Sequence, residues 1–166
     1  REIGNKGGIA RSLHQLGTIE YRRGNLDKAE GLYQDSLKLK REIGDKGGIS
    51  NSLGQLGNIE QDRGNLDKAG GLYQESLQLF REIGDKGGMA NSLGQLGLLY
   101  TKQEKYEQAL YCLDMAFNLF SEMGVPQKEQ ALSYIADIKE KVGEEKFKEM
   151  MARIQGRTGE EKPSAT

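Results

Sequence analysis

Hydrophobic residues recur along this chain with the spacing of one face of an α-helix, three or four positions apart. The first stripe consists of Ile9, Leu13, Leu16 and Ile19. A second stripe follows and consists of Leu26, Ala29, Leu32, Tyr33, Leu37 and Leu39. Between the stripes, Gly24 and Asn25 are typical of a helix end followed by a helix start. The pattern predicts two helices joined by a tight turn, and the alternating pattern of a β-strand is absent.

The same pattern returns at a fixed period. Segment 4–8 (Gly-Asn-Lys-Gly-Gly) recurs at 44–48 and 84–88 with Asp in place of Asn, and Gly124 stands in the same phase. Residues 5–44 and 45–84 differ at only 11 positions, a similarity that unrelated segments do not show. A helix pair exposes an apolar face that only its neighbour can cover, so such units occur in stacks. We therefore expect an all-α repeat protein built from antiparallel helix pairs.

Small and large residues also hold fixed positions within the repeat. The first repeat shows this skeleton as Leu13, Leu16-Gly17, Ala29, Tyr33 and Ser36. It resembles the tetratricopeptide repeat, with Leu13 where that family usually has Trp. The 40-residue unit is longer than the usual one of about 34 and is similar to the long-helix variety of spindle-orientation adaptors and bacterial signalling proteins. The resemblance implies a right-handed α-solenoid, a superhelix that binds protein or peptide partners without any cofactor.

The period also divides the chain into segments. From the amino end we expect the last turn of a truncated preceding repeat, three full repeats, a degenerate fourth helix pair that caps the stack, and a disordered tail without apolar periodicity. In this order the segments are 1–4, 5–44, 45–84, 85–124, 125–155 and 156–166. An uncovered first pair predicts a homo-oligomer formed through the open N-terminal end.

Differences between the first two repeats concentrate on their first helices, where six of the 11 lie. In the family that the chain resembles, the first helices line a concave groove, and five of the six implied groove positions in the first repeat differ from those in the second. The implied partner-binding residues are Arg11, His14, Gln15, Thr18, Tyr21, Arg22, Asn51, Gln55, Asn58, Gln61, Asp62, Asn91, Gln95, Leu98 and Lys102. Drift at exposed polar positions explains the same differences, so both interpretations remain open.

The implied groove also suggests what kind of ligand it takes. Its recurring amides each offer a donor and an acceptor, which suits the backbone of an extended peptide. Arg11, Arg22 and Lys102 outnumber the acidic Asp62, which favours an acidic segment. Alternatively, Arg22 and Asp62 pair with each other, which would mask that charge.

The composition and a few single residues argue against other classes of partner and against catalysis. The net charge is −1 with both signs interspersed, so we expect neither a nucleic-acid nor a membrane partner. Cys112 is the only cysteine, which fits the cytoplasm. His14 is the only histidine and has no partners spaced for catalysis or metal binding. Glu20 and Glu60 stand one period apart, which makes paired-carboxylate chemistry an accident of repetition.

Two functions follow from the sequence. The first is a protein-interaction scaffold with no enzymatic activity, part of a larger repeat protein. The alternative is a self-assembly module that joins arrays end to end or exchanges helices.

Overall fold

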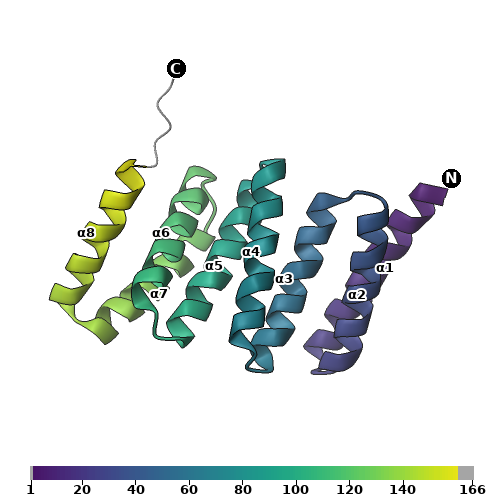
Figure 1. The fold of residues 1–166 in the computed structure, drawn as a ribbon, viewed down its shortest axis with the longest axis horizontal. Coiled ribbons are helices and arrows are strands. Elements are labelled where there is room, and N and C mark those ends of the chain that lie inside the picture. The colour runs from purple at the N-terminus through teal and green to yellow at the C-terminus, as the bar shows by residue number, and fades with distance from the viewer. Residues whose placement is uncertain (1, 161–166) are drawn as a thin grey trace, which may run out of the picture. The chain divides into compact units, whose positions relative to one another are not determined.

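The computed structural model describes the backbone of residues 2–160 and the side chains of residues 5–156. Over this range the chain forms eight helices and no strand, which confirms the all-α prediction (Figure 1). They are α1 (Glu2–Arg22), α2 (Leu26–Glu42), α3 (Lys46–Asp62), α4 (Leu66–Ile83), α5 (Lys86–Lys102), α6 (Tyr106–Glu122), α7 (Gln127–Val142) and α8 (Glu144–Glu160).

The chain divides into two compact units, Arg1–Ser92 and Leu93–Thr166, and α5 runs across the division. In the first unit, α1 packs against α2, α2 against α3, and α3 against α4. In the second unit, α6 packs against both α7 and α8. Helices that follow each other in sequence run antiparallel within each unit (Figure 1).

The junction between two repeats is a helix stop followed directly by a helix start. Gly84 ends α4 with φ of 70°, a left-handed conformation that other residues rarely adopt. The carboxylate of Asp85 then accepts a hydrogen bond from the backbone N–H of Gly88 at 2.9 Å. Asp45 caps α3 in the same way. The recurring Gly-Asp pair therefore turns the chain between repeats.

Within each pair, a mid-helix glycine lets the second helix approach closely. A Cβ built on Gly57 would lie 2.6 Å from the ring of Tyr73, and one on Gly17 would lie 2.9 Å from the ring of Tyr33. In the third repeat the equivalent Gly97 faces Leu113 at 2.6 Å. The Leu-Gly motif thus marks the site of one recurring helix contact.

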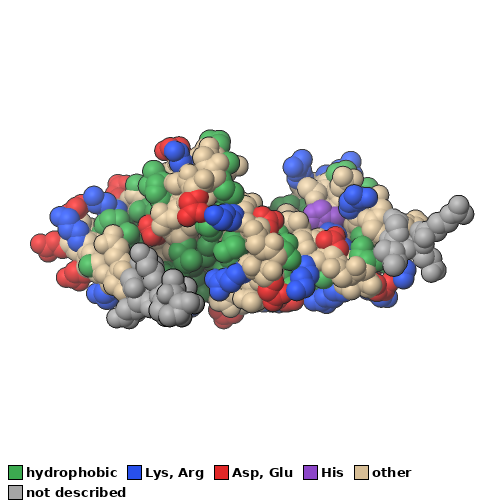
Figure 2. All heavy atoms as spheres, turned by 90° about the horizontal axis from the view of Figure 1, so that it is seen from above, with side chains coloured by type: hydrophobic (Ala, Val, Ile, Leu, Met, Phe, Trp, Pro, Cys, Tyr) green, Lys and Arg blue, Asp and Glu red, His purple; other side chains and the backbone are tan. Residues whose placement is uncertain are grey.

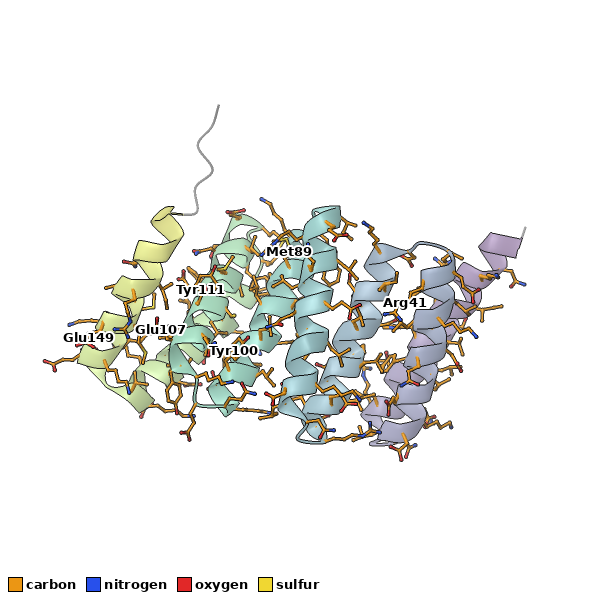
Figure 3. The ribbon with its side chains drawn as sticks, in the orientation of Figure 1. Arg41, Met89, Tyr100, Glu107, Tyr111 and Glu149 are labelled. Carbon is orange, nitrogen blue, oxygen red and sulfur yellow. The ribbon has the colours of Figure 1, made fainter. Side chains whose placement is uncertain are left out.

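The second unit has its own core, drawn from α6, α7 and α8. Its buried side chains include Leu110, Leu113, Ile138, Met150 and Ile154. On the surface, Glu107 of α6 accepts a hydrogen bond from Arg153 of α8 at 3.0 Å (Figure 3). The segment expected to form a fourth helix pair, 125–155, therefore supplies α7 and most of α8.

Two segment boundaries differ from expectation. Residues 2–4, expected to end a preceding helix, form the first turn of α1. Continuing the helix gives their backbone groups intrahelical partners. The expected tail is helical as far as Glu160, and residues 161–166 lie outside the described part. The helix α8 includes Gly156 and Gly159, and an interior glycine costs about 1 kcal/mol, which is too little to end a helix by itself.

Replacing Gly57 with alanine should destabilise the chain, because its new methyl group overlaps the Tyr73 ring. We expect a loss of about 1–3 kcal/mol in the free energy of unfolding, measured by urea denaturation. Gly71 is the matched control, since a Cβ there meets nothing within 4 Å. Gly71→Ala should gain up to about 1 kcal/mol from helix propensity. Equal effects of the two substitutions would contradict the close-approach account.

Candidate functional site

The predicted groove residues of the first two repeats lie on α1 and α3, and we call this set the α1/α3 face. Its members are Arg11, His14, Gln15, Thr18, Tyr21, Arg22, Asn51, Gln55, Asn58, Gln61 and Asp62. Tyr21 joins the two helices, because its hydroxyl donates to the Asp62 carboxylate at 2.6 Å. Burial, together with that carboxylate, raises the pKa of Tyr21 to about 12. Asp62 is therefore held by Tyr21, whereas the sequence had suggested Arg22 as its partner.

Tyrosines from the second helices reach through to the same face. The hydroxyl of Tyr33 donates to Thr18 at 3.1 Å and lies 3.4 Å from Gln55 Oε1. The hydroxyl of Tyr73 donates to Asn58 at 2.7 Å, and the Asn58 amide in turn donates to Gln55. Some of the recurring amides therefore stabilise the contact between helices. The half-buried amides Gln55 and Asn58 can offer a ligand only those N–H groups that are not used in these contacts.

Other predicted residues are more accessible. Arg11, Gln15, Arg22 and Asn51 are exposed. Gln61 is half-buried, and its side-chain oxygen has no hydrogen-bond partner among the described residues. The exposed part of the α1/α3 face therefore carries two arginines, two amides and the carboxylate of Asp62.

The predicted groove residues of the third repeat form a third row, which lies on α5 and is divided between the two units. Asn91 belongs to the first unit, and Gln95, Leu98 and Lys102 belong to the second. Asn91 and Lys102 are exposed, while Gln95 and Leu98 are half-buried. The structure brings together the rows on α1 and α3 only, so a groove that includes α5 remains a prediction.

A buried lysine lies beneath the α1/α3 face, and the sequence analysis did not identify it. Lys40 of α2 is only 4% exposed, and its ammonium donates to Ser52 Oγ at 3.0 Å. The same ammonium lies 3.4 Å from Nδ1 of His14, whose ring packs beside Tyr33 with the centroids 5.2 Å apart. Burial lowers the pKa of Lys40, and Asp45 opposes that shift. Burial, reinforced by Lys40, lowers the pKa of His14 to about 4.

Glu20 and Glu60 hold the turn within each of the first two repeats. Glu60 is 3% exposed and accepts hydrogen bonds from Asn65 at 2.8 Å and from Lys68 at 2.7 Å. Glu20 accepts equivalently from Asn25 at 2.7 Å. Their recurrence at the same phase as the Gly-Asn turn was the signal for this structural role.

Groups that would suggest other chemistry are few in the described part of the chain. No cluster of His, Cys, Asp and Glu suited to a metal ion occurs there. Cys112 is buried, and burial raises the pKa of its thiol to about 12. None of the described helices combines the length and apolar character needed to cross a membrane. Figure 2 shows acidic and basic side chains interspersed on the face in view.

The molecule is a helical repeat protein, because its helix pairs recur with a fixed period and each of the first three pairs has the same close contact at a glycine. Two models, both described as "Tetratricopeptide repeat", match residues 9–43 and 48–122, which together make up more than half of the sequence. The chain belongs to the tetratricopeptide repeat family. No curated protein matches this sequence.

Solved structures share the fold at low sequence identity. The crystal structure of BtubC (BKLC) from P. vanneervenii is 19% identical with a TM-score of 0.74, over 95% of this chain and 67% of that one. The apo form of RapI is 16% identical with a TM-score of 0.77, over 82% and 38% respectively. The N-terminal domain of stress-induced protein-1 (STI-1) from C. elegans is 15% identical with a TM-score of 0.60, over 81% and 95%. At such identities the likeness shows the fold alone.

Replacing Glu60 with glutamine should destabilise the second repeat at neutral pH. Hydrogen bonds from Lys68 and Asn65 hold the pKa of Glu60 below its ordinary value of 4.5. The carboxylate therefore stabilises the fold fully above that value, and its contribution is lost as the pH falls through the lowered pKa. We expect Glu60→Gln to cost about 1 kcal/mol at pH 7, measured by urea denaturation, and the difference from the parent to shrink near pH 3.

Glu75 provides the control for this prediction. Its side chain is 51% exposed and lies 3.5 Å from Arg41, an arrangement that contributes little to stability. Glu75→Gln should leave the unfolding midpoint nearly unchanged at both pH values. A Glu60→Gln variant that behaves like Glu75→Gln would exclude the structural role of Glu60.

Proposed function

We propose that this chain is a protein-interaction scaffold that binds an extended acidic segment of a partner protein on its α1/α3 face. The tetratricopeptide repeat is in general a protein-interaction repeat without catalytic activity. The observation that carries the proposal is the position of the differences between the repeats. Among six matched groove positions, five differ between the first and second repeats, while Leu13, Leu16-Gly17, Ala29, Tyr33 and Ser36 recur unchanged one period later. A cytoplasmic location accompanies the proposal, because buried Cys112 has no second cysteine to pair with.

Charge on the α1/α3 face favours an acidic partner. Arg11 and Arg22 are both exposed on α1. The one carboxylate among the proposed binding residues is the exposed Asp62, which accepts a short hydrogen bond from Tyr21 and is outnumbered by the two arginines. Exposed guanidinium groups bind carboxylates through paired hydrogen bonds, which gives direction as well as attraction. An acidic segment laid along α1 would meet both arginines.

Charge reversal on the α1/α3 face should weaken this binding. We expect acetyl-(Glu-Ser)5-amide to bind in isothermal titration, and acetyl-(Lys-Ser)5-amide not to bind. Arg22→Glu should weaken the acidic peptide at least fivefold, since it replaces attraction with repulsion. Lys38→Glu makes the same change of charge at an exposed position of α2 and should leave the affinity within twofold. Equal effects of the two variants would discard the α1/α3 face as the binding site.

A specific observation also favours self-association as a second function. Leu16 and Ile19 of α1 are 50% and 45% exposed. Their counterparts in the second repeat, Leu56 and Ile59, are 8% and 0% exposed and pack in one core with α2 residues such as Leu37. In the second repeat, the helix that covers this stripe is therefore α2, the second helix of the preceding pair. We propose a second copy of the chain as the occupant of the exposed stripe on α1.

Charged substitutions on this apolar surface should abolish association. We expect the average mass from light scattering to rise with concentration for the parent chain, and the Leu16→Glu/Ile19→Glu variant to remain a monomer throughout. Leu132 is 42% exposed in the second unit, so Leu132→Glu is the matched control and should associate like the parent. A parent that stays monomeric at every concentration would exclude this function.

A further inference from the structure

The first repeat places a lysine where the fold otherwise places phenylalanine. Lys40 stands one period before Phe80 and two before Phe120, and all three side chains are buried. The Lys40 stem lies against Gly48 as the Phe80 ring lies against Gly88. An aromatic side chain is therefore compatible with this location, and the charge at residue 40 is not required by packing.

A second difference between the repeats accompanies the first. His14 approaches the Lys40 ammonium, whereas the residue that matches His14 in the second repeat is Gly54. The pair Gly54 and Phe80 in one repeat thus corresponds to His14 and Lys40 in the other. His14 and Lys40 both differ from the second repeat and are in contact with each other, so we treat the two differences as one feature.

The surroundings of Lys40 fix the tautomer of His14. An ammonium group donates hydrogen bonds and cannot accept them. Nδ1 of His14 lies 3.4 Å from the Lys40 ammonium and 3.5 Å from Ser52 Oγ, and the ammonium favours the neutral tautomer in which Nδ1 accepts and Nε2 carries the proton. The His14 side chain is half-buried, and its hydrogen-bond contacts with described residues are made at Nδ1, so Nε2 is the ring nitrogen left for a ligand.

The Lys40 ammonium has only neutral hydrogen-bond partners. Ser52 Oγ accepts from it and His14 Nδ1 lies 3.4 Å away, while the nearby carboxylate of Asp45 accepts from the backbone N–H of Gly48. Burying a cation is unfavourable unless an anion compensates it, and such departures from the local packing rule occur typically at functional sites. Asp45 compensates the Lys40 charge in part, and a ligand carboxylate would add to that compensation.

We propose that His14, Lys40 and Ser52 form a carboxylate subsite of the α1/α3 face, in which the buried ammonium of Lys40 fixes His14 to donate from Nε2 to the ligand. The subsite rests on the proposed function for the source of its ligand, an acidic side chain of the partner segment. Lys40 acts as a positioning residue beneath the face, and His14 makes the contact.

Nitrogen NMR tests the positioning role directly, because His14 is the only histidine in the chain. The parent should show a neutral ring protonated on Nε2 between pH 5 and pH 8. In Lys40→Met the fixed tautomer should be lost, and the pKa of His14 should rise from about 4 toward its ordinary value of 6.5, because the neighbouring positive charge is gone. A parent ring protonated on Nδ1, or a ring unchanged by Lys40→Met, would overturn the proposal.

Binding is tested with sodium acetate as the probe and acetamide as its neutral control. Acetate should shift the His14 nitrogen signals of the parent in a saturable way, and acetamide should not. The shift should disappear in Lys40→Met. His14→Gly/Lys40→Phe copies the pair of the second repeat and lacks the histidine signal, so there the backbone amide of Ser52 is followed, which acetate should shift in the parent and not in this variant. A shift that persists in both variants would overturn the subsite.

The outcomes also separate the subsite from the proposed function. If acetyl-(Glu-Ser)5-amide binds and is weakened by Arg22→Glu but not by Lys40→Met, the subsite fails and the scaffold function stands. If acetate binds at His14 but the acidic peptide does not bind the chain, the subsite stands and the proposed partner class fails.

Discussion

The close approach of two helices at a glycine is the constraint on which each repeat depends. Where the Tyr73 ring lies over Gly57, no Cβ fits, and the ring can pass between helices to place its hydroxyl on Asn58. Tyr33 does the same over Gly17 and reaches Thr18. One contact thus serves two purposes, because it packs the helix pair and also anchors polar groups of the α1/α3 face.

The sequence predicted well those parts of the molecule that depend on local pattern. The helices, their turns and the glycine contacts follow from local periodicity, from Gly-Asn and Gly-Asp turns, and from the family resemblance, and the structure confirms the fold. The helix ends at residues 2–4 and 156–160 were harder to predict, because helix formation there depends on whether a neighbour interrupts it. The pattern of hydrophobic residues in one sequence does not show at which residue such a helix ends.

The side-chain partners within the candidate site could be predicted only in part. The sequence placed His14, Thr18 and Asn58 on one surface, but it did not show that Tyr33 and Tyr73 reach them from the second helices. Lys40 was missed because its position belongs to a buried stripe, where a cation is unexpected. Comparison of residue 40 with residues 80 and 120 contained the signal, since a charge replaces an aromatic ring at a matched position.

The central claim is that the α1/α3 face is where a partner binds, and chemical-shift mapping of the backbone amides with bound acetyl-(Glu-Ser)5-amide tests it most directly. The account predicts that the perturbed residues cluster on α1 and α3, around Arg11, His14 and Asn51. Perturbations confined to the outer positions of α2 and α4, or to the exposed apolar surface at Leu16 and Ile19, would contradict it.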